Sequence, residues 1–341
     1  MFHVSNFLSR IVRLSHNLNQ TTNMKRTIRA SLFITLCFLS GSALAQLPVS
    51  LMLPEASPKE TRSITIGFTT ISFEYNSVGI KGREIWGGLV PYGEVWRTGA
   101  NKNTLFTVTD DVLINGQELK AGSYGMHTIP GEEEWVIIFS NFSEAWGSYF
   151  YDESEDALRI TVTPEAMESK YEWMKFSFSN YTATSVDISL KWAHLDVPFK
   201  VEIPMETTFS HIENQFRTLP AFSWQGWVQG ATYLQNNDYK LDVALKWAAR
   251  AVQIDRSVQT IGLHAKLLVL NGNNEDGLKE ANEMRKEWAN DWRSHYSAAE
   301  VYEEAEDLKK AEEAYKKAID LANDERTKQV LMRRIDSLKE K

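Results

Sequence analysis

The chain has 341 residues, 43% of them hydrophobic and 24% charged, so it is long enough to bury more than one core. Its 37 Lys and Arg against 45 Asp and Glu give a net charge of −8, which makes nucleic acid and anionic lipid headgroups poor partners. Cys37 is the only cysteine, so the chain can form neither an internal disulfide nor a metal site of several cysteines.

The N-terminal segment has the pattern of a secretory signal. Basic residues from Lys25 onward precede an apolar run at residues 30–39 that is too short to span a bilayer, and the small residues at 43–45 suit cleavage by signal peptidase. We expect residues 1–45 to be a signal peptide with an upstream extension. The mature chain is then exported to the periplasm or outside the cell, without a transmembrane segment.

Residues 46–61 contain three prolines and are expected to form a linker. The following segment, 62–204, alternates apolar and polar residues with a period of two, which is typical of strands with one buried face. Asn115-Gly116 predicts a tight hairpin, since both residue types tolerate a positive φ. Many short strands favour a β-sandwich, with a closed barrel as the alternative. The clearest strands lie at 71–75, 123–129, 135–139, 158–163, 186–192 and 197–203.

After a second expected linker at 205–222, the hydrophobic pattern changes to helical spacing. A set of mostly small residues recurs 67 residues later, which is about two units of 34 residues. The pattern over residues 223–324 resembles tetratricopeptide repeats, and 326–341 would form a capping helix. The fold class is therefore α+β in two segregated domains. The matching residues are Ala244, Trp247, Ala248 and Ala251 with Ala311, Ala314, Tyr315 and Ala318; Leu278, Ala281 and Met284 mark a middle unit.

Three ordered segments of the β half resemble the signature segments of a secreted bacterial family catalogued as domain of unknown function 2911. They are Lys81–Thr104, Ile114–Trp135 and Trp146–Pro164, and the resemblance extends over about residues 60–204. The family brings no established activity, so the resemblance implies an exported β domain and leaves its function to the residues themselves.

The segment GLVPYGEVWRTGAN, Gly88–Asn101, suits an irregular loop because glycine and proline weaken helices and strands. Trp96 is expected to plug one end of the sandwich, and Asn101 to cap the element that follows. Arg97 carries a planar fork of donors suited to a carboxylate. In a packing interpretation, Arg97 is buried against an acid such as Asp156.

In a binding interpretation of the same loop, Arg97 holds an anion while Trp96 or Trp146 stacks on a flat ligand, beside His127. A lone histidine in a strand is more often structural than catalytic. The acidic run Tyr151–Ala157 lacks the spacing of a calcium loop and suits a solvated turn. No catalytic motif, cofactor fingerprint or metal-ligand spacing is recognised, so we expect no cofactor and no metal.

Three hypotheses for function follow. The first is an exported, non-catalytic binding and scaffold protein, whose β-sandwich binds a small or carbohydrate-like ligand and whose repeats bind a protein or peptide, of basic or mixed charge. The second is a hydrolase of glycan or peptide that uses Arg97, His127 and an acid such as Asp156. The third is a purely structural assembly module.

Overall fold

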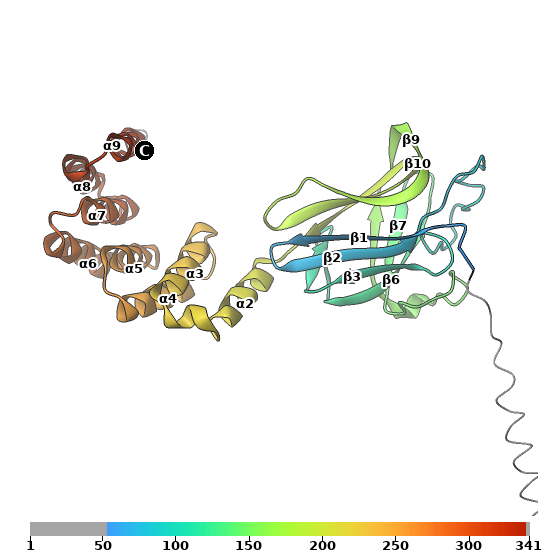
Figure 1. The fold of residues 1–341 in the computed structure, drawn as a ribbon, viewed down its shortest axis with the longest axis horizontal. Coiled ribbons are helices and arrows are strands. Elements are labelled where there is room, and N and C mark those ends of the chain that lie inside the picture. The colour runs from blue at the N-terminus through green and yellow to red at the C-terminus, as the bar shows by residue number, and fades with distance from the viewer. Residues whose placement is uncertain (1–52, 339–341) are drawn as a thin grey trace, which may run out of the picture. The chain divides into compact units, whose positions relative to one another are not determined.

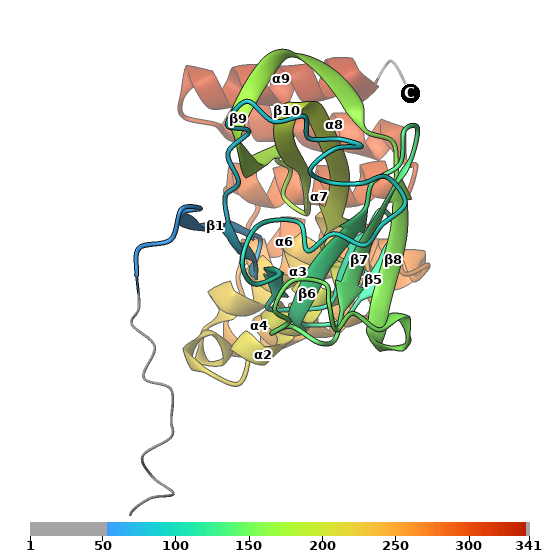
Figure 2. The same ribbon diagram turned by 90° about the vertical axis from the view of Figure 1, so that its right-hand side faces the viewer.

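The computed structural model describes residues 53–338, so the predicted signal peptide, its cleavage site and the start of the first linker lie outside the described residues. The first part is built of strands that form two sheets (Figures 1 and 2). The strands are β1 Lys59–Ile66, β2 Thr69–Asn76, β3 Thr104–Val108, β4 Val112–Ile114, β5 Gln117–Leu119, β6 Gly122–Ile129, β7 Trp135–Ser140, β8 Asp156–Val162, β9 Glu165–Ser179 and β10 Ser185–Glu202.

The two sheets are antiparallel and open. The larger has the order β1-β2-β3-β6-β7-β8, and the smaller has the order β5-β4-β10-β9. This confirms the predicted sandwich, and no sheet formed by residues 53–338 closes into a barrel. Asn115 and Gly116 form the predicted hairpin between β4 and β5, with φ values of 48° and 81°.

One hydrophobic core lies between the sheets, because each strand directs alternate apolar side chains inward. Phe73 of β2 stacks on Phe176 of β9 with ring centroids 4.2 Å apart, which joins the two layers. Phe106 of β3 contacts Phe139 of β7 within the larger sheet, at 5.0 Å. The period-two pattern in the sequence therefore predicts correctly which face of each strand is buried.

The last strand differs from expectation, because the stretches at 186–192 and 197–203 belong to one strand, β10. Buried apolar residues fall on even positions up to Trp192 and on odd positions from Val197. The pairing with β9 shifts on both sides of Ala193, whose φ is 53°. This irregularity adds the residue that returns the apolar side chains to the core.

The second part of the described chain is helical. Three antiparallel hairpins follow one another, α3 with α4, α5 with α6 and α7 with α8, and α9 packs on α8 as the predicted capping helix (Figure 1). This confirms the helical-hairpin repeats. The helices are α2 Met205–Gln215, α3 Trp224–Asn236, α4 Leu241–Ile254, α5 Val258–Leu270, α6 Asn274–Glu287, α7 Trp292–Glu304, α8 Leu308–Leu321 and α9 Glu325–Leu338, with a 3₁₀ turn, η2, at Leu219–Phe222.

Small residues explain the close packing within each hairpin. Ala244, Gly277 and Ala311 are buried at matching positions in α4, α6 and α8. A Cβ atom on Gly277 would lie 2.7 Å from the carbonyl oxygen of Ala265, so a larger residue would push α5 and α6 apart. The middle unit, degenerate in sequence, thus has the same geometry as its neighbours.

Helical structure begins at Met205, within the segment expected to be a linker. Phe209 of α2 stacks on Trp247 of α4 at 5.7 Å, and Phe216 stacks on Trp227 of α3 at 4.0 Å. These rings join the first helical core and not the β core. The aromatic residues of the expected linker therefore extend the repeat array by one helix.

Candidate functional site

The loop between β2 and β3 closes one end of the β core with indole rings. Trp86 and Trp96 lie in this loop and contact Trp135 of β7 and Trp192 of β10. The ring of Trp96 stacks on that of Trp192 at 5.7 Å and is 9% exposed. Trp96 is therefore a packing residue, which leaves Trp146 as the exposed indole of the expected ligand site.

The backbone of this loop pairs with β6 and places Arg97 beside His127. Trp96 and Thr128 exchange two main-chain hydrogen bonds of 2.8 Å, so the residues next to them, Arg97 and His127, lie opposite each other with their side chains on one face. That face is the outer one, since Met126 on the other side of β6 belongs to the core.

Arg97 does not make the expected contact with Asp156. Among residues 53–338, no carboxylate oxygen lies within 4.0 Å of its guanidinium, and its Nε is buried without a hydrogen-bond partner. Asp156 accepts a hydrogen bond of 2.7 Å from the Tyr151 hydroxyl and lies 3.4 Å from Arg159. The side chain that pairs with Asp156 is therefore Arg159 of β8.

His127 is 1% exposed and lies under the loop that joins β7 to β8. Its Nδ1 is 3.2 Å from the Ser148 hydroxyl, and its ring centroid is 5.3 Å from that of Tyr151. Burial lowers the pKa of His127 to about 4, so the imidazole is neutral at physiological pH. His127 thus supports Ser148 and supplies no charge to the site.

Tyr151 and Asp156 form a partly buried pair beside His127. Burial raises the pKa of both groups, and the acceptor Asp156 raises that of Tyr151 further. Oδ1 of Asp156 is buried without a hydrogen-bond partner. Because Tyr151 occupies the space between His127 and Asp156, the acid does not orient the imidazole as it does in a catalytic triad.

The β7–β8 loop lies on the sheet because Gly125 of β6 has no side chain. A Cβ there would collide with the carbonyl oxygen of Phe142 and with the side chain of Asn103. The loop is also held from the side, since Gly147 donates a hydrogen bond of 3.2 Å to the carbonyl oxygen of Asn101, and Asn103 donates one of 3.0 Å to that of Ala145. Asn101 therefore acts through its backbone, with φ at 59°.

Between these hydrogen bonds, Lys102 and Trp146 form an antiparallel bridge, so their side chains lie on one side of it. Trp146 is 58% exposed, Tyr149 83% and Phe150 71%. Arg97, Lys102, Ser148 and these three rings therefore belong to one surface, which we call the aromatic loop site. Exposed rings of this number in one loop are typical of a binding surface.

Four residues of this region were not predicted from the sequence: Lys102, Ser148, Tyr151 and Arg159. Of the six predicted residues, the structure brings Arg97, His127 and Trp146 to the aromatic loop site and places Asp156 at its edge. The segment Trp146–Tyr151, with four aromatic residues outside a strand, is the signal that would have indicated Ser148 and Tyr151.

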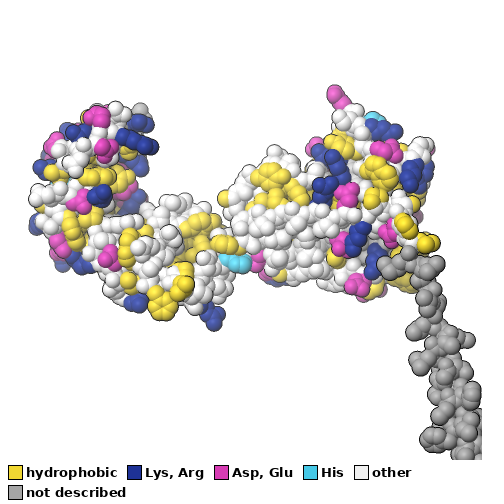
Figure 3. Space-filling model, viewed as in Figure 1, with side chains coloured by type: hydrophobic (Ala, Val, Ile, Leu, Met, Phe, Trp, Pro, Cys, Tyr) yellow, Lys and Arg dark blue, Asp and Glu magenta, His cyan; other side chains and the backbone are white. Residues whose placement is uncertain are grey.

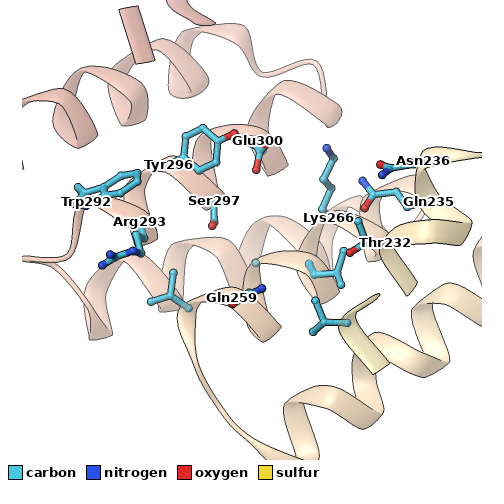
Figure 4. A pocket seen from close by; sticks show the side chains of 14 residues that line it. Thr232, Gln235, Asn236, Gln259, Lys266, Trp292, Arg293, Tyr296, Ser297 and Glu300 are labelled. Carbon is cyan, nitrogen blue, oxygen red and sulfur yellow. Dashed lines mark hydrogen bonds between the residues drawn. The ribbon is translucent and has the colours of Figure 1, made fainter. Parts of the chain in front are cut away.

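A second candidate site is a groove in the helical part. It has a volume of about 440 Å³ and is lined by the first helix of each hairpin, α3, α5 and α7. Figure 4 shows polar side chains of all three helices directed into this space, among them Gln235, Gln259 and Lys266 opposite Tyr296 and Glu300. We call it the repeat groove. None of the residues predicted for the β domain lines it.

Charges on the face shown in Figure 3 are interspersed, with Lys and Arg beside Asp and Glu over both sheets and helices. Within residues 53–338, no group of three or more His, Cys, Asp or Glu is placed to hold a metal ion. In the same range, every helix is too short or too polar to cross a membrane.

Comparison with known proteins adds a family for the β part. Residues 57–201 match the family model "Protein of unknown function (DUF2911)", which confirms the resemblance seen in the sequence. No match is found among curated proteins. Among solved structures, residues 41 to the end of MamA from Desulfovibrio magneticus RS-1 are similar, with 15% identity and a TM-score of 0.28, over 40% of this chain and 84% of that one.

Proposed function

We propose that this chain is an exported binding and scaffold protein. Its repeats hold a protein partner through an extended segment in the repeat groove, and its β domain holds a small carbohydrate-like ligand at the aromatic loop site. The observation that carries the scaffold role is the repeat groove itself, a continuous hollow of about 440 Å³ along three successive hairpins. The signal-like pattern of residues 1–45 supports export.

The lining of the repeat groove suits an extended peptide. Gln235, Asn236 and Gln259 offer amide groups that can donate to and accept from a peptide backbone. Trp292 and Tyr296 form an aromatic wall, with ring centroids 6.4 Å apart. Peptide recognition commonly combines such backbone hydrogen bonds with pockets for side chains.

The charges in the repeat groove are mixed. Lys266 lies 3.8 Å from Glu304, and Arg293 lies 3.5 Å from Asp291, so each cation is partly neutralised by an acid of the chain. Glu300 accepts a hydrogen bond of 3.1 Å from Tyr296. This lining supports a partner of mixed charge.

Peptide binding by the full chain tests the scaffold role. We expect selected decapeptides from a random-sequence array to bind, and the double variant Gln259→Ala, Arg293→Ala to weaken them at least about tenfold, since both residues are exposed and their loss leaves the fold intact. Lys316→Ala on α8, also exposed but outside the groove, is the control. Equal binding by both variants would contradict the proposal.

The exposed rings favour the carbohydrate part of the proposal. Sugars present C–H faces that pack on aromatic rings, and their hydroxyls need donors and acceptors such as Ser148 at the same surface. The hydrolase hypothesis has less support, because Tyr151 separates Asp156 from His127. A purely structural role leaves the exposed Trp146 and Tyr149 without a purpose.

A further inference from the structure

The aromatic loop site contains two cations that residues 53–338 do not neutralise. Neither Arg97 nor Lys102 has an acidic partner within 4.0 Å in the described part of the chain. Nε of Arg97 is moreover buried without a hydrogen-bond partner. An unmet donor of a charged group is costly in a folded protein and commonly indicates a missing acceptor.

The surrounding structure places Lys102 beside the exposed indole and links Arg97 to the same loop. Thr104 donates a hydrogen bond of 3.1 Å to the carbonyl oxygen of Arg97, which closes the short loop that carries Arg97 at one end and Lys102 at the other. Lys102 is directly opposite Trp146. Arg97 is opposite His127, whose ring contacts Ser148, two residues after Trp146.

The local charge is unusual for this protein, whose net charge is −8. Most acidic residues of the β7–β8 loop lie at its far end, where Glu153 and Asp156 lie 2.7 and 3.4 Å from Arg159. Glu144, near Trp146, is exposed and forms no ion pair with Arg97 or Lys102 within 4.0 Å. The two ends of the loop are therefore electrostatically different. The end at Trp146 carries two cations without an acidic partner among residues 53–338, and the end at Asp156 is closed by its own ion pairs.

We propose that the ligand of the aromatic loop site is an acidic saccharide, in which a uronate carboxylate is bound by Arg97 and Lys102 while the sugar ring stacks on Trp146. The planar fork of Arg97 matches a carboxylate, and Lys102 adds a second, mobile positive charge. Ser148 is placed to hydrogen-bond a ring hydroxyl. This inference rests on the proposed carbohydrate function and specifies the class of sugar.

The test uses the full chain and a panel of oligogalacturonate, oligomannuronate and oligoglucuronate, each beside its neutral methyl ester. Calorimetry should show binding of at least one acid, and the ester of the same sugar should bind at least about tenfold more weakly, because charge-assisted hydrogen bonds are lost. Binding of the acid should weaken as the salt concentration rises.

Variants locate the site. Arg97→Gln and Lys102→Gln should each reduce affinity for the acid about tenfold with little effect on the ester, and Arg97→Lys should restore part of it. Trp146→Ala should abolish binding of both forms. Trp173→Ala is the matched control, since this tryptophan is 41% exposed elsewhere on the β domain. Circular dichroism of each variant verifies the fold.

Two results would overturn the inference, and they differ in what else they remove. Equal, Trp146-dependent binding of acid and ester would refute the acidic sugar and leave the carbohydrate function standing. Binding of no member of the panel, acid or ester, would refute both.

Discussion

Tyr151 lies between the two titratable groups that most resembled a catalytic pair, since its hydroxyl donates to Asp156 at 2.7 Å and its ring is 5.3 Å from that of His127. The arrangement separates the roles of the two groups. His127 is a buried support for Ser148, and Asp156 belongs to an ion pair with Arg159. The surface above them is consequently better suited to holding a ligand than to moving a proton.

Arg97 and Trp96 are adjacent in sequence and should differ sharply in their contribution to stability. Arg97→Ala leaves no buried acid unpaired, so the free energy of unfolding should change by roughly 1 kcal/mol or less. Trp96→Ala removes an indole from the core and should cost about 3–5 kcal/mol. Chemical denaturation of both variants measures this. A loss above about 3 kcal/mol for Arg97→Ala would show that a structural ion pair had been broken.

His127 should make the β domain sensitive to acid. Its pKa is lowered by burial from 6.5 to about 4, so below pH 6.5 the unfolded chain binds a proton that the folded chain excludes. The contribution of the neutral His127 to the free energy of unfolding, on the order of 3 kcal/mol, is fully present above pH 6.5. It is lost progressively as the pH falls to 4. As the pH is lowered from 7 to 4, the unfolding free energy of wild type should therefore fall relative to that of His127→Gln, by on the order of 3 kcal/mol. Parallel curves would contradict a neutral, buried imidazole.

Gly125→Ala should dislodge the β7–β8 loop. The added methyl group would collide with the backbone of Phe142, which cannot move without lifting the loop, and we expect a cost of about 1–3 kcal/mol. Gly122→Ala is the control, because its methyl group meets only the ring end of Tyr124, at 3.2 Å. Stability and sugar binding should both decrease in Gly125→Ala and remain unchanged in Gly122→Ala. Unchanged behaviour of Gly125→Ala would show that the loop is not seated there.

The β domain should fold without the helices. Phe209 and Phe216 pack into the helical core, so a fragment of residues 57–204 keeps the whole β core. Circular dichroism should show a β-type spectrum, and heating should give one cooperative transition. An unfolded fragment would mean that α2 contributes more to the β domain than its contacts indicate.

If the protein is exported as proposed, cleavage should begin the mature chain at Gln46, immediately after the small residues at 43–45. Mass spectrometry of protein recovered from the producing cells gives the N-terminus directly. Retention of residues 24–45 would refute the signal peptide and, with it, the proposal of export.

Much of the fold could be predicted from sequence because its signals are local. The alternation in β2, the continuous apolar run in β7 and the recurrence of Ala244 at Ala311 depend only on near neighbours in the chain. The continuity of β10 could not be predicted, since the shift at Ala193 is defined by its partner strand. Helix α2 was missed because Phe209 finds its stacking partner, Trp247, far along the chain in α4.

The candidate site was predictable in its residue types and not in its contacts. The pattern around Trp96 indicates a packed loop, but the partner of Arg97 depends on the pairing of Trp96 with Thr128, which no local pattern encodes. Likewise, the position of Ser148 over His127 depends on the packing of the β7–β8 loop against Gly125. Such long-range relationships follow from the fold and must be read from it.

The indole rings that close the β core also give the protein a built-in optical reporter. The centroid of Trp86 lies 4.8 Å from Trp135, 5.5 Å from Trp192 and 6.0 Å from Trp96, and Trp96 lies 5.7 Å from Trp192. Electronic transitions of rings at these separations couple, and the resulting exciton bands in circular dichroism depend on the angles between the rings. Two of the rings belong to the loop and two to the sheets, so seating of the loop can be followed without any attached dye.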